Sequence, residues 1–383
     1  MRSFRIFLVV SAVFVLSGCT KGGSGPVGVT DTEILFGEYG SFTGAESTFG
    51  VSTHEGVMMA VEEANAAGGV QNRKIRVIHY DDQGKSDEAV TAVTKLITQD
   101  RVLLVLGEVA SSRSIAAGAI AQQYQIPMIS PSSTNPRVTQ LGDYIFRVCF
   151  IDPFQGSVMA KFAAEGLKIK RAAIFRDIRS DYSMGLANYF AEDFKKRGGE
   201  IVADVSYSQG DVDFKSQLTA IKKATPEVLF VPGYYTEVGI IAKQAKEVGL
   251  KAELLGGDGW DSEKLTEIGG KAIYGAYFSS HYSHEDQNPV VQTFVKNYQE
   301  KYKHVPNSLA AMGYDAAKVA IDALKRTKEL TPKAVRDAIA QTKDFAGVTG
   351  TITINDQRDA VKSAVVLKVA GEQKYDYVTT VTP

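Results

Sequence analysis

The sequence GEVASSRSIAAGAIAQQYQIPMISPSSTNPR, residues 107–137, decides the fold. It follows the apolar run VLLVL at 102–106, which is typical of a strand buried on both faces of a parallel sheet. Ser111 and Ser112 then open a predicted helix, because serine is favoured at helix N-termini. The next predicted strand covers 126–129, and the hydroxyl-rich segment SPSST at 130–134 ends it.

Two consecutive strands would therefore deliver hydroxyls and free backbone N–H groups to one edge of the sheet. In open α/β sheets, ligands bind at the carboxyl ends of the strands. A helix N-terminus at that edge favours an anion. The stretch predicts a site for a small anionic or zwitterionic molecule.

The elements on both sides continue this alternation. Toward the N-terminus we expect strands at 32–39 and 74–80 and helices at 48–67 and 87–99. A strand at 144–150 leads to Asp152 and Pro153, which favour a helix start. A second α/β run follows, with strands at 171–175, 200–206, 228–232 and 253–256 and helices at 183–197, 214–224 and 236–248. The pattern predicts an α/β fold with two lobes, each a parallel sheet flanked by helices.

The C-terminal part predicts further crossings between the lobes. The strand at 274–280 is expected to cross back, and the tail is expected to finish on the second lobe. Between and beyond these points we expect helices at 290–302, 308–325 and 332–342 and strands at 350–355, 364–370 and 375–380. The predicted lobes are 31–150 plus 279–355 and 151–278 plus 356–383. Such a multi-strand hinge allows closure over a cleft by rigid-body rotation.

Length and charge limit the class of protein. The 383 residues suggest two domains, and 44% hydrophobic with 23% charged residues is ordinary for a soluble globular protein. The net charge of −1 and the absence of a basic run exclude binding to nucleic acid by bulk charge.

The first residues predict a targeting segment. Arg2 and Arg5 precede the apolar run 6–16, which is too short to span a bilayer. The run ends in LSGC, which resembles a bacterial lipobox with lipidation of Cys19; the alternative is an ordinary signal peptide with an incidental cysteine. We expect a signal peptide at 1–19 and a flexible tether at 20–30. A lipidated Cys19 leaves Cys149 without a disulfide partner, and the apolar context of Cys149 predicts a buried, inert thiol.

Signals for catalysis are weak. His54 and Glu55 begin a zinc-protease pattern, but Met58 stands where the second histidine would be. His281 and His284 lie near two acidic residues, and a surface loop is favoured over a metal site there. The sequence has no nucleophile elbow, phosphate loop or dinucleotide-binding turn. We therefore predict no enzyme activity, no metal and no cofactor.

A dry cleft that holds an amino acid must provide partners for both of its charges. Ser111, Thr134 and the helix N–H groups can donate to the carboxylate. Asp258 and the carbonyl of Ser132 can accept from the ammonium, although Asp258 between two glycines would also suit a plain turn. Several aromatic residues near strand ends are candidate walls for the ligand side chain, with core packing as the alternative for each: Tyr39, Phe49, Tyr182, Tyr234 and Trp260.

At these residues the mature chain resembles the periplasmic branched-chain amino acid binding proteins of ABC transporters, which have the type I periplasmic binding fold. The segments that carry the resemblance are 107–112, 126–136, 181–185, 232–235 and 256–261, and ISPSSTNP within 129–136 is the most specific.

The resemblance implies roles for particular residues. Residues matching Ser111 and Thr134 hold the ligand carboxylate and amine, and the backbone at Ser132 takes part. An acid at the position of Asp258 binds the ammonium from the second lobe. A tyrosine matching Tyr182 closes over the ligand, and an aromatic residue near Phe49 lines the pocket.

Three positions need separate comment. Some family members have Glu at the position of Asp258, so the shorter side chain can move the ammonium or admit a larger ligand. Some have a first-lobe disulfide, and Ala110 stands where one of its cysteines would be. Arg113 is expected to be solvated, with contact to a second ligand carboxylate as the alternative.

The prediction is a monomeric, lipid-anchored extracytoplasmic protein. It captures a small amino acid, most consistent with a branched-chain or hydrophobic one, and delivers it to a membrane permease with ATPase subunits. A sensor of the same fold for amides, urea or aromatic acids is the alternative. A secreted hydrolase is the least favoured interpretation.

Overall fold

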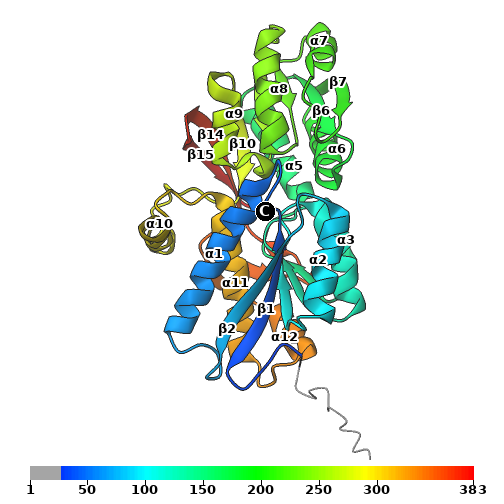
Figure 1. Ribbon diagram of the computed structural model, residues 1–383. Helices are drawn as coiled ribbons and strands as arrows, with labels where there is room; N and C mark the ends of the chain where they lie inside the picture. Colours follow the sequence, from blue (N-terminus) through cyan, green and yellow to red (C-terminus); the bar gives the residue numbers. More distant parts are fainter. Residues whose placement is uncertain (1–26) are drawn as a thin grey trace, which may run out of the picture.

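The computed structural model describes residues 27–383, which form two lobes joined by a narrow waist (Figure 1). The predicted signal peptide and Cys19 lie outside the described residues. The predicted tether overlaps the fold at its end, because Gly28 O accepts a hydrogen bond from Leu35 N at 2.7 Å and Val29 forms a β-bridge with Ile34. The packed chain therefore begins before residue 31.

The first lobe contains a fully parallel sheet in the order β2-β1-β3-β4-β5. Alternate residues of its central strand face opposite sides, as β geometry requires. Leu104 and Leu106 pack with α1 and α11, whereas Val105 packs with α2 and α3. The strands are β1 (Glu33–Gly40), β2 (Lys74–Asp81), β3 (Leu104–Leu106), β4 (Met128–Ser130) and β5 (Ile145–Arg147).

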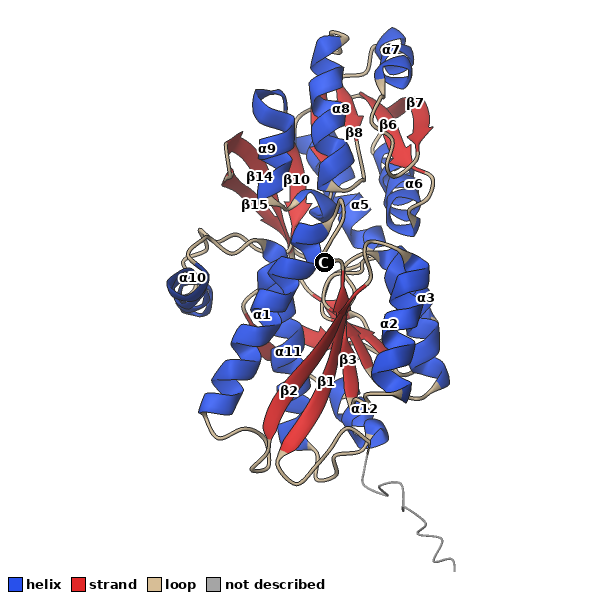
Figure 2. Cartoon of the chain, viewed as in Figure 1, coloured by secondary structure: helices blue, strands red, loops and turns tan. Residues whose placement is uncertain are grey.

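Helices cover both faces of this sheet (Figure 2). They are α1 (Ser47–Ala66), α2 (Ser86–Thr98), α3 (Ser111–Gln123), α4 (Arg137–Gln140), α11 (Ser308–Arg326) and α12 (Pro332–Ala340). A further helix of this lobe, α10 (Pro289–Tyr302), packs on α1 and α11, away from the sheet. A small antiparallel sheet is formed by β11 (Phe345–Gly347), β12 (Gly350–Ile354) and β13 (Ala360–Val361).

The second lobe contains a mixed sheet in the order β15-β14-β10-β9-β8-β6-β7. Its five strands β6 to β10 are parallel, and the two C-terminal strands add antiparallel pairs at one edge. The strands are β6 (Arg171–Asp177), β7 (Glu200–Tyr207), β8 (Val228–Phe230), β9 (Glu253–Gly256), β10 (Tyr277–Ser280), β14 (Ala364–Gly371) and β15 (Lys374–Val381). The helices are α5 (Asp152–Lys161), α6 (Asp181–Lys196), α7 (Lys215–Lys223), α8 (Tyr235–Glu247) and α9 (Glu263–Gly269).

The described chain passes between the lobes three times: between β5 and α5, between β10 and α10, and between β13 and β14. The strand predicted at 274–280 does not itself cross back, because Tyr277–Ser280 pairs with β9 and β14 of the second sheet. Ala360–Val361 pairs with β12 on the first-lobe side, so the last crossing falls later than residue 356. Pairing between distant strands decides these limits, and local sequence does not reveal it.

Within residues 27–383, no helix combines the length and apolar character that crossing a bilayer requires.

Candidate functional site

A small cavity lies between the lobes. Both lobes line it: Phe49, Val109, Ser111, Ser132, Thr134 and Leu309 from the first, and Tyr182, Tyr234, Asp258 and Gly259 from the second. Most of these residues follow the carboxyl ends of parallel strands, where ligand sites of α/β sheets form. Seven of the eight predicted ligand-binding residues therefore come together. Val109 and Leu309 were not predicted, since no local signal separates them from core residues.

Two buried hydroxyls on the first-lobe side, Ser132 Oγ and Thr134 Oγ1, make no hydrogen bond of good geometry within the described part of the chain. The Thr134 hydroxyl lies near the buried Asp152 carboxyl and lowers its pKa, against the effect of burial. Ser111 Oγ accepts a hydrogen bond from Asn135 N at 3.1 Å and stands in the first turn of α3. The first N–H groups of a helix have no intrahelical acceptor, so this corner offers several donors to an anion.

In the hydroxyl-rich segment after β4, some side chains hold neighbouring loops together and others line the cavity. Ser130 Oγ and Ser133 Oγ donate to the carbonyl of Glu108 at 2.7 and 2.8 Å, which ties the loops after β3 and β4 together. Ser132 and Thr134, which alternate with Ser133 along the chain, line the cavity instead. The structural hydroxyls thus hold the loop that carries the unpartnered ones.

Asp258 is the acidic group on the opposite wall, and it is 6% exposed. Gln155 Nε2 donates to its Oδ1 at 2.7 Å, and His281 Nε2 lies 3.0 Å from its Oδ2. The surface position predicted for His281 is wrong, because His281 is 2% exposed and stacks on Phe150. The burial of His281 could not be predicted from its polar neighbours in the sequence, because the residues that it contacts are distant in the chain.

An aromatic cluster closes one side of the cavity. Tyr182 and Tyr234 stack in parallel with ring centroids 5.5 Å apart, and Phe49 meets Tyr234 edge-on at 5.3 Å. The glycines beside Asp258 permit this packing, because a Cβ at Gly257 would lie 2.3 Å from Tyr182 Oη. A Cβ at Gly259 would lie 2.8 Å from the Tyr234 ring. The close packing of the aromatic wall therefore requires glycine at both positions.

Two aromatic candidates belong to the cores. Trp260 is fully buried, donates from Nε1 to the carbonyl of Val231 at 2.9 Å and does not line the cavity. Tyr39 packs in the first lobe, where its hydroxyl contacts Met128 Sδ at 3.5 Å. Cys149 is a buried free thiol as predicted, and burial raises its pKa to about 12.

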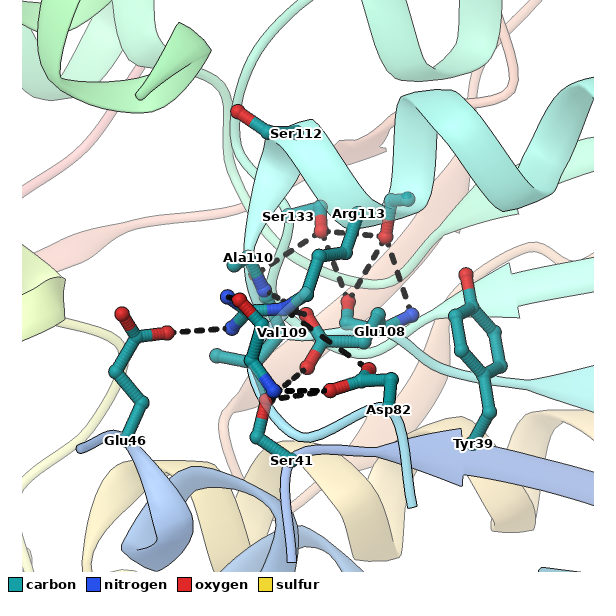
Figure 3. A network of polar contacts seen from close by, with 12 residues as sticks. Tyr39, Ser41, Glu46, Asp82, Glu108, Val109, Ala110, Ser112, Arg113 and Ser133 are labelled. Atoms are coloured by element: carbon teal, nitrogen blue, oxygen red, sulfur yellow. Dashed lines mark hydrogen bonds and ion pairs between the residues drawn. The ribbon is translucent and has the colours of Figure 1, made fainter. Parts of the chain in front are cut away.

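Arg113 is 3% exposed, so the expected solvated position is wrong. Its guanidinium lies 2.6 Å from Glu46, 3.1 Å from Glu108 and 3.9 Å from Asp82 (Figure 3). In the same view Ser112 points away from this cluster, and Ser41 Oγ donates to Asp82 at 2.7 Å. Arg113 therefore anchors the loop before α1 to the start of α3.

Three carboxylates around one guanidinium leave excess negative charge in a buried place. Burial raises the pKa of Glu108 to about 8, and the charge of Asp82 adds to this effect while Arg113 opposes it. A protonated Glu108 at neutral pH reduces the repulsion. Burial and the neighbouring carboxylate thus favour retention of a proton within the cluster.

The lobes are closed over the cavity. Thr48 Oγ1 and Ser262 Oγ are 2.9 Å apart, and Thr236 Oγ1 donates to the carbonyl of Ala45 at 2.6 Å. A further contact between the lobes is the pair of Arg137 with Asp181 at 2.7 Å. These contacts hold the two lobes together around the cavity, so the fold and the site together define a two-lobe solute-binding protein.

Comparisons with known proteins agree with this class. The family model described as "Periplasmic binding protein" matches residues 33–374, and the chain belongs to that family. The chain is 38% identical to a leucine binding protein from Thermotoga maritima, with a TM-score of 0.88 over 91% of this chain and 99% of that one. It is 33% identical to a branched-chain amino acid transporter substrate binding protein from Streptococcus pneumoniae in complex with isoleucine, with a TM-score of 0.87 over 92% and 100%.

Among curated relatives, it is 29% identical over 321 residues to a leucine-, isoleucine-, valine-, threonine- and alanine-binding protein from Pseudomonas aeruginosa, covering 84% of this chain and 85% of that one.

Proposed function

We propose that the protein binds a branched-chain amino acid between its lobes and delivers it to an ABC permease and its ATPase subunits. The observation that carries the proposal is the pairing of chemistry across the cavity. Ser132 and Thr134 present unpartnered hydroxyls on one wall, and Asp258 presents a carboxylate on the other. A zwitterion satisfies both walls, whereas an uncharged molecule leaves the buried Asp258 carboxylate without a counter-charge.

The remaining residues that line the cavity indicate what kind of ligand side chain fits there. Phe49, Val109 and Leu309 are apolar, and the two stacked tyrosines add aromatic faces. The cavity is small and both lobes line it, which suits a molecule of amino-acid size rather than a larger one. The similar solved structures are a leucine binding protein and a complex with isoleucine, which supports a branched-chain amino acid as the ligand.

A calorimetric panel on protein stripped of ligand by unfolding and refolding tests the ligand. We expect one-to-one binding that is tightest for L-leucine, L-isoleucine or L-valine. Leucinamide and 4-methylpentanoate each lack one charge and should bind about 100-fold more weakly, because a buried partner loses its counter-charge. Tightest binding of urea, an amide or an aromatic acid would contradict the proposal, and turnover of a bound ester or amide would indicate a hydrolase.

We also propose that the protein acts outside the cytoplasm as a monomer anchored by lipid on Cys19. The order of charged residues, apolar run and LSGC in the sequence supports this location. Labelling with an alkyne fatty acid in a bacterial host, compared between the wild type and Cys19→Ala, tests it. Loss of label in the variant is expected, and equal labelling of both would contradict it.

A further inference from the structure

Both oxygens of the Asp258 carboxylate are held by neutral donors from the hinge. Gln155 Nε2 donates to Oδ1 at 2.7 Å and also to Ser279 Oγ at 3.0 Å. His281 Nε2 lies 3.0 Å from Oδ2. Two donors on two oxygens fix the plane of the carboxylate, and each oxygen keeps a lone pair for a ligand.

The two donors come from two of the chain crossings between the lobes. Gln155 lies in the first turns of α5, directly after the crossing from β5, and His281 directly follows β10. Phe150, in the first crossing, stacks on the His281 ring with centroids 4.0 Å apart and an interplanar angle of 28°. Residues beside the crossings between the lobes therefore fix the orientation of the Asp258 carboxylate.

Burial favours a neutral His281 ring, against the two carboxylates that face it. Burial lowers the pKa of His281, and Lys362 in the third crossing acts in the same direction, while Asp258 and Asp261 oppose them. A neutral imidazole with its proton on Nε2 donates to Asp258 without neutralising it. An arginine or lysine in this place would compete with the ligand ammonium for the same carboxylate.

We propose that His281, assisted by Gln155, is a positioning residue that orients Asp258 and so sets the preference for ligands that carry an ammonium group. The inference rests on the proposed function, because it assigns Asp258 to the ammonium. His281 does not line the cavity, and its effect passes through Asp258.

The test compares two ligands that differ at one group. L-leucine and 4-methyl-2-oxopentanoate share the side chain and the carboxylate, but only L-leucine has an ammonium. The ratio of their affinities isolates the ammonium contact, and a purely structural role for His281 would change both affinities equally. Displacement of labelled L-leucine measures the weaker ligand.

Three variants distinguish the effect of the hydrogen bond that His281 donates from the effect of the packing of its ring. His281→Phe keeps the stack on Phe150 and removes the donor, so the affinity ratio should fall about tenfold or more, as expected for a lost hydrogen bond to a charge. His281→Gln places an amide N–H near the position of Nε2 and should restore most of the ratio. His284→Phe, in the same loop, makes no contact with Asp258 and should leave the ratio at the wild-type value.

Gln155→Met provides an independent measurement if His281→Phe does not fold. It removes the other donor and should lower the ratio in the same direction. An unchanged ratio in the folded His281→Phe protein, or in Gln155→Met when the first does not fold, overturns the inference and leaves the proposed function intact. Wild-type protein that binds L-leucine no better than the oxo acid overturns both.

Discussion

The hydroxyl of Ser112 on the first lobe accepts a hydrogen bond from the backbone N–H of Asp181 on the second lobe, at 2.9 Å. Ser112 does not line the cavity, although its neighbour Ser111 does. Adjacent residues at the start of α3 thus serve different purposes: one faces the site and the other holds the closed lobes together.

Ser112→Ala should weaken amino acid binding without removing a ligand contact. The hydrogen bond joins the two lobes in the closed form, so its loss disfavours closure by about 0.5–1.5 kcal/mol, or up to roughly tenfold in affinity. Calorimetry measures the affinity, and small-angle scattering measures the closed fraction. Ser86→Ala, an exposed serine at the start of α2 in the same lobe, is the matched control. Equal affinity in both variants would refute a role in closure.

Ser111→Ala and Asp258→Ala should each reduce affinity by about 1–3 kcal/mol or more, because each removes a partner of a buried ligand charge. Titration with the tightest ligand of the panel measures the loss. Asp376→Ala, on the exposed strand β15, controls for a change of net charge. If both site variants bind like the parent, the assignment of the cavity as the ligand site is wrong.

Phe49→Ala should reduce the affinity for L-leucine more than that for L-alanine. The ring lines the cavity and meets Tyr234 edge-on, so its loss removes apolar contact that a long side chain uses and a methyl group does not. The selectivity between the two amino acids should fall about tenfold, corresponding to 1–2 kcal/mol. Val51→Ala, exposed in the same helix, should leave selectivity unchanged. A parallel loss for both ligands would show that Phe49 acts on folding or closure alone.

Arg113→Met should lower the free energy of unfolding by about 3–5 kcal/mol, because it leaves buried carboxylates without their counter-charge. Denaturant unfolding of the ligand-free protein measures the change. Lys215→Met removes an exposed pair with Glu247 and should cost less than about 1 kcal/mol. Similar stability of the two variants would indicate that solvent reaches the Arg113 cluster.

Asp152→Asn should stabilise the protein increasingly as the pH rises from about 4 to 8. Burial raises the pKa of Asp152 to about 8, and the charge of Asp258 adds to this. Between the unfolded and folded pKa values the folded state holds a proton that the unfolded state has lost, so native stability falls with pH, by about 1.4 kcal/mol per unit of pKa shift. Unfolding curves across this range, with exposed Asp87→Asn as control, measure the difference. A constant difference across the range would contradict the raised pKa.

Residues that line the cavity are predictable from the sequence where they follow strand ends. Ser111, Ser132, Thr134 and Asp258 lie after predicted strands, and parallel strands bring their carboxyl ends to one edge, so local pattern was sufficient. Arg113 was misplaced because its burial depends on carboxylates from three other segments, which no local pattern connects.

Tertiary packing decided the other differences. His281 stands in a polar segment, yet the crossing from β10 carries it under Phe150. Trp260 follows Asp258 closely, but the turn directs its ring away from the cavity, toward Gly256 and Phe278. The direction in which each side chain of a short turn points depends on backbone angles, and residue type alone does not determine these angles.

Trp260 is the only tryptophan of the chain, and its backbone lies two residues from the acid that faces the cavity. Its indole is shielded from water and donates to the carbonyl of Val231, so we expect its emission to change when the Asp258 turn moves. The indole is thus an intrinsic fluorophore beside the acid that we propose binds the ammonium, and stopped flow without any attached dye tests whether it reports the kinetics of ligand capture.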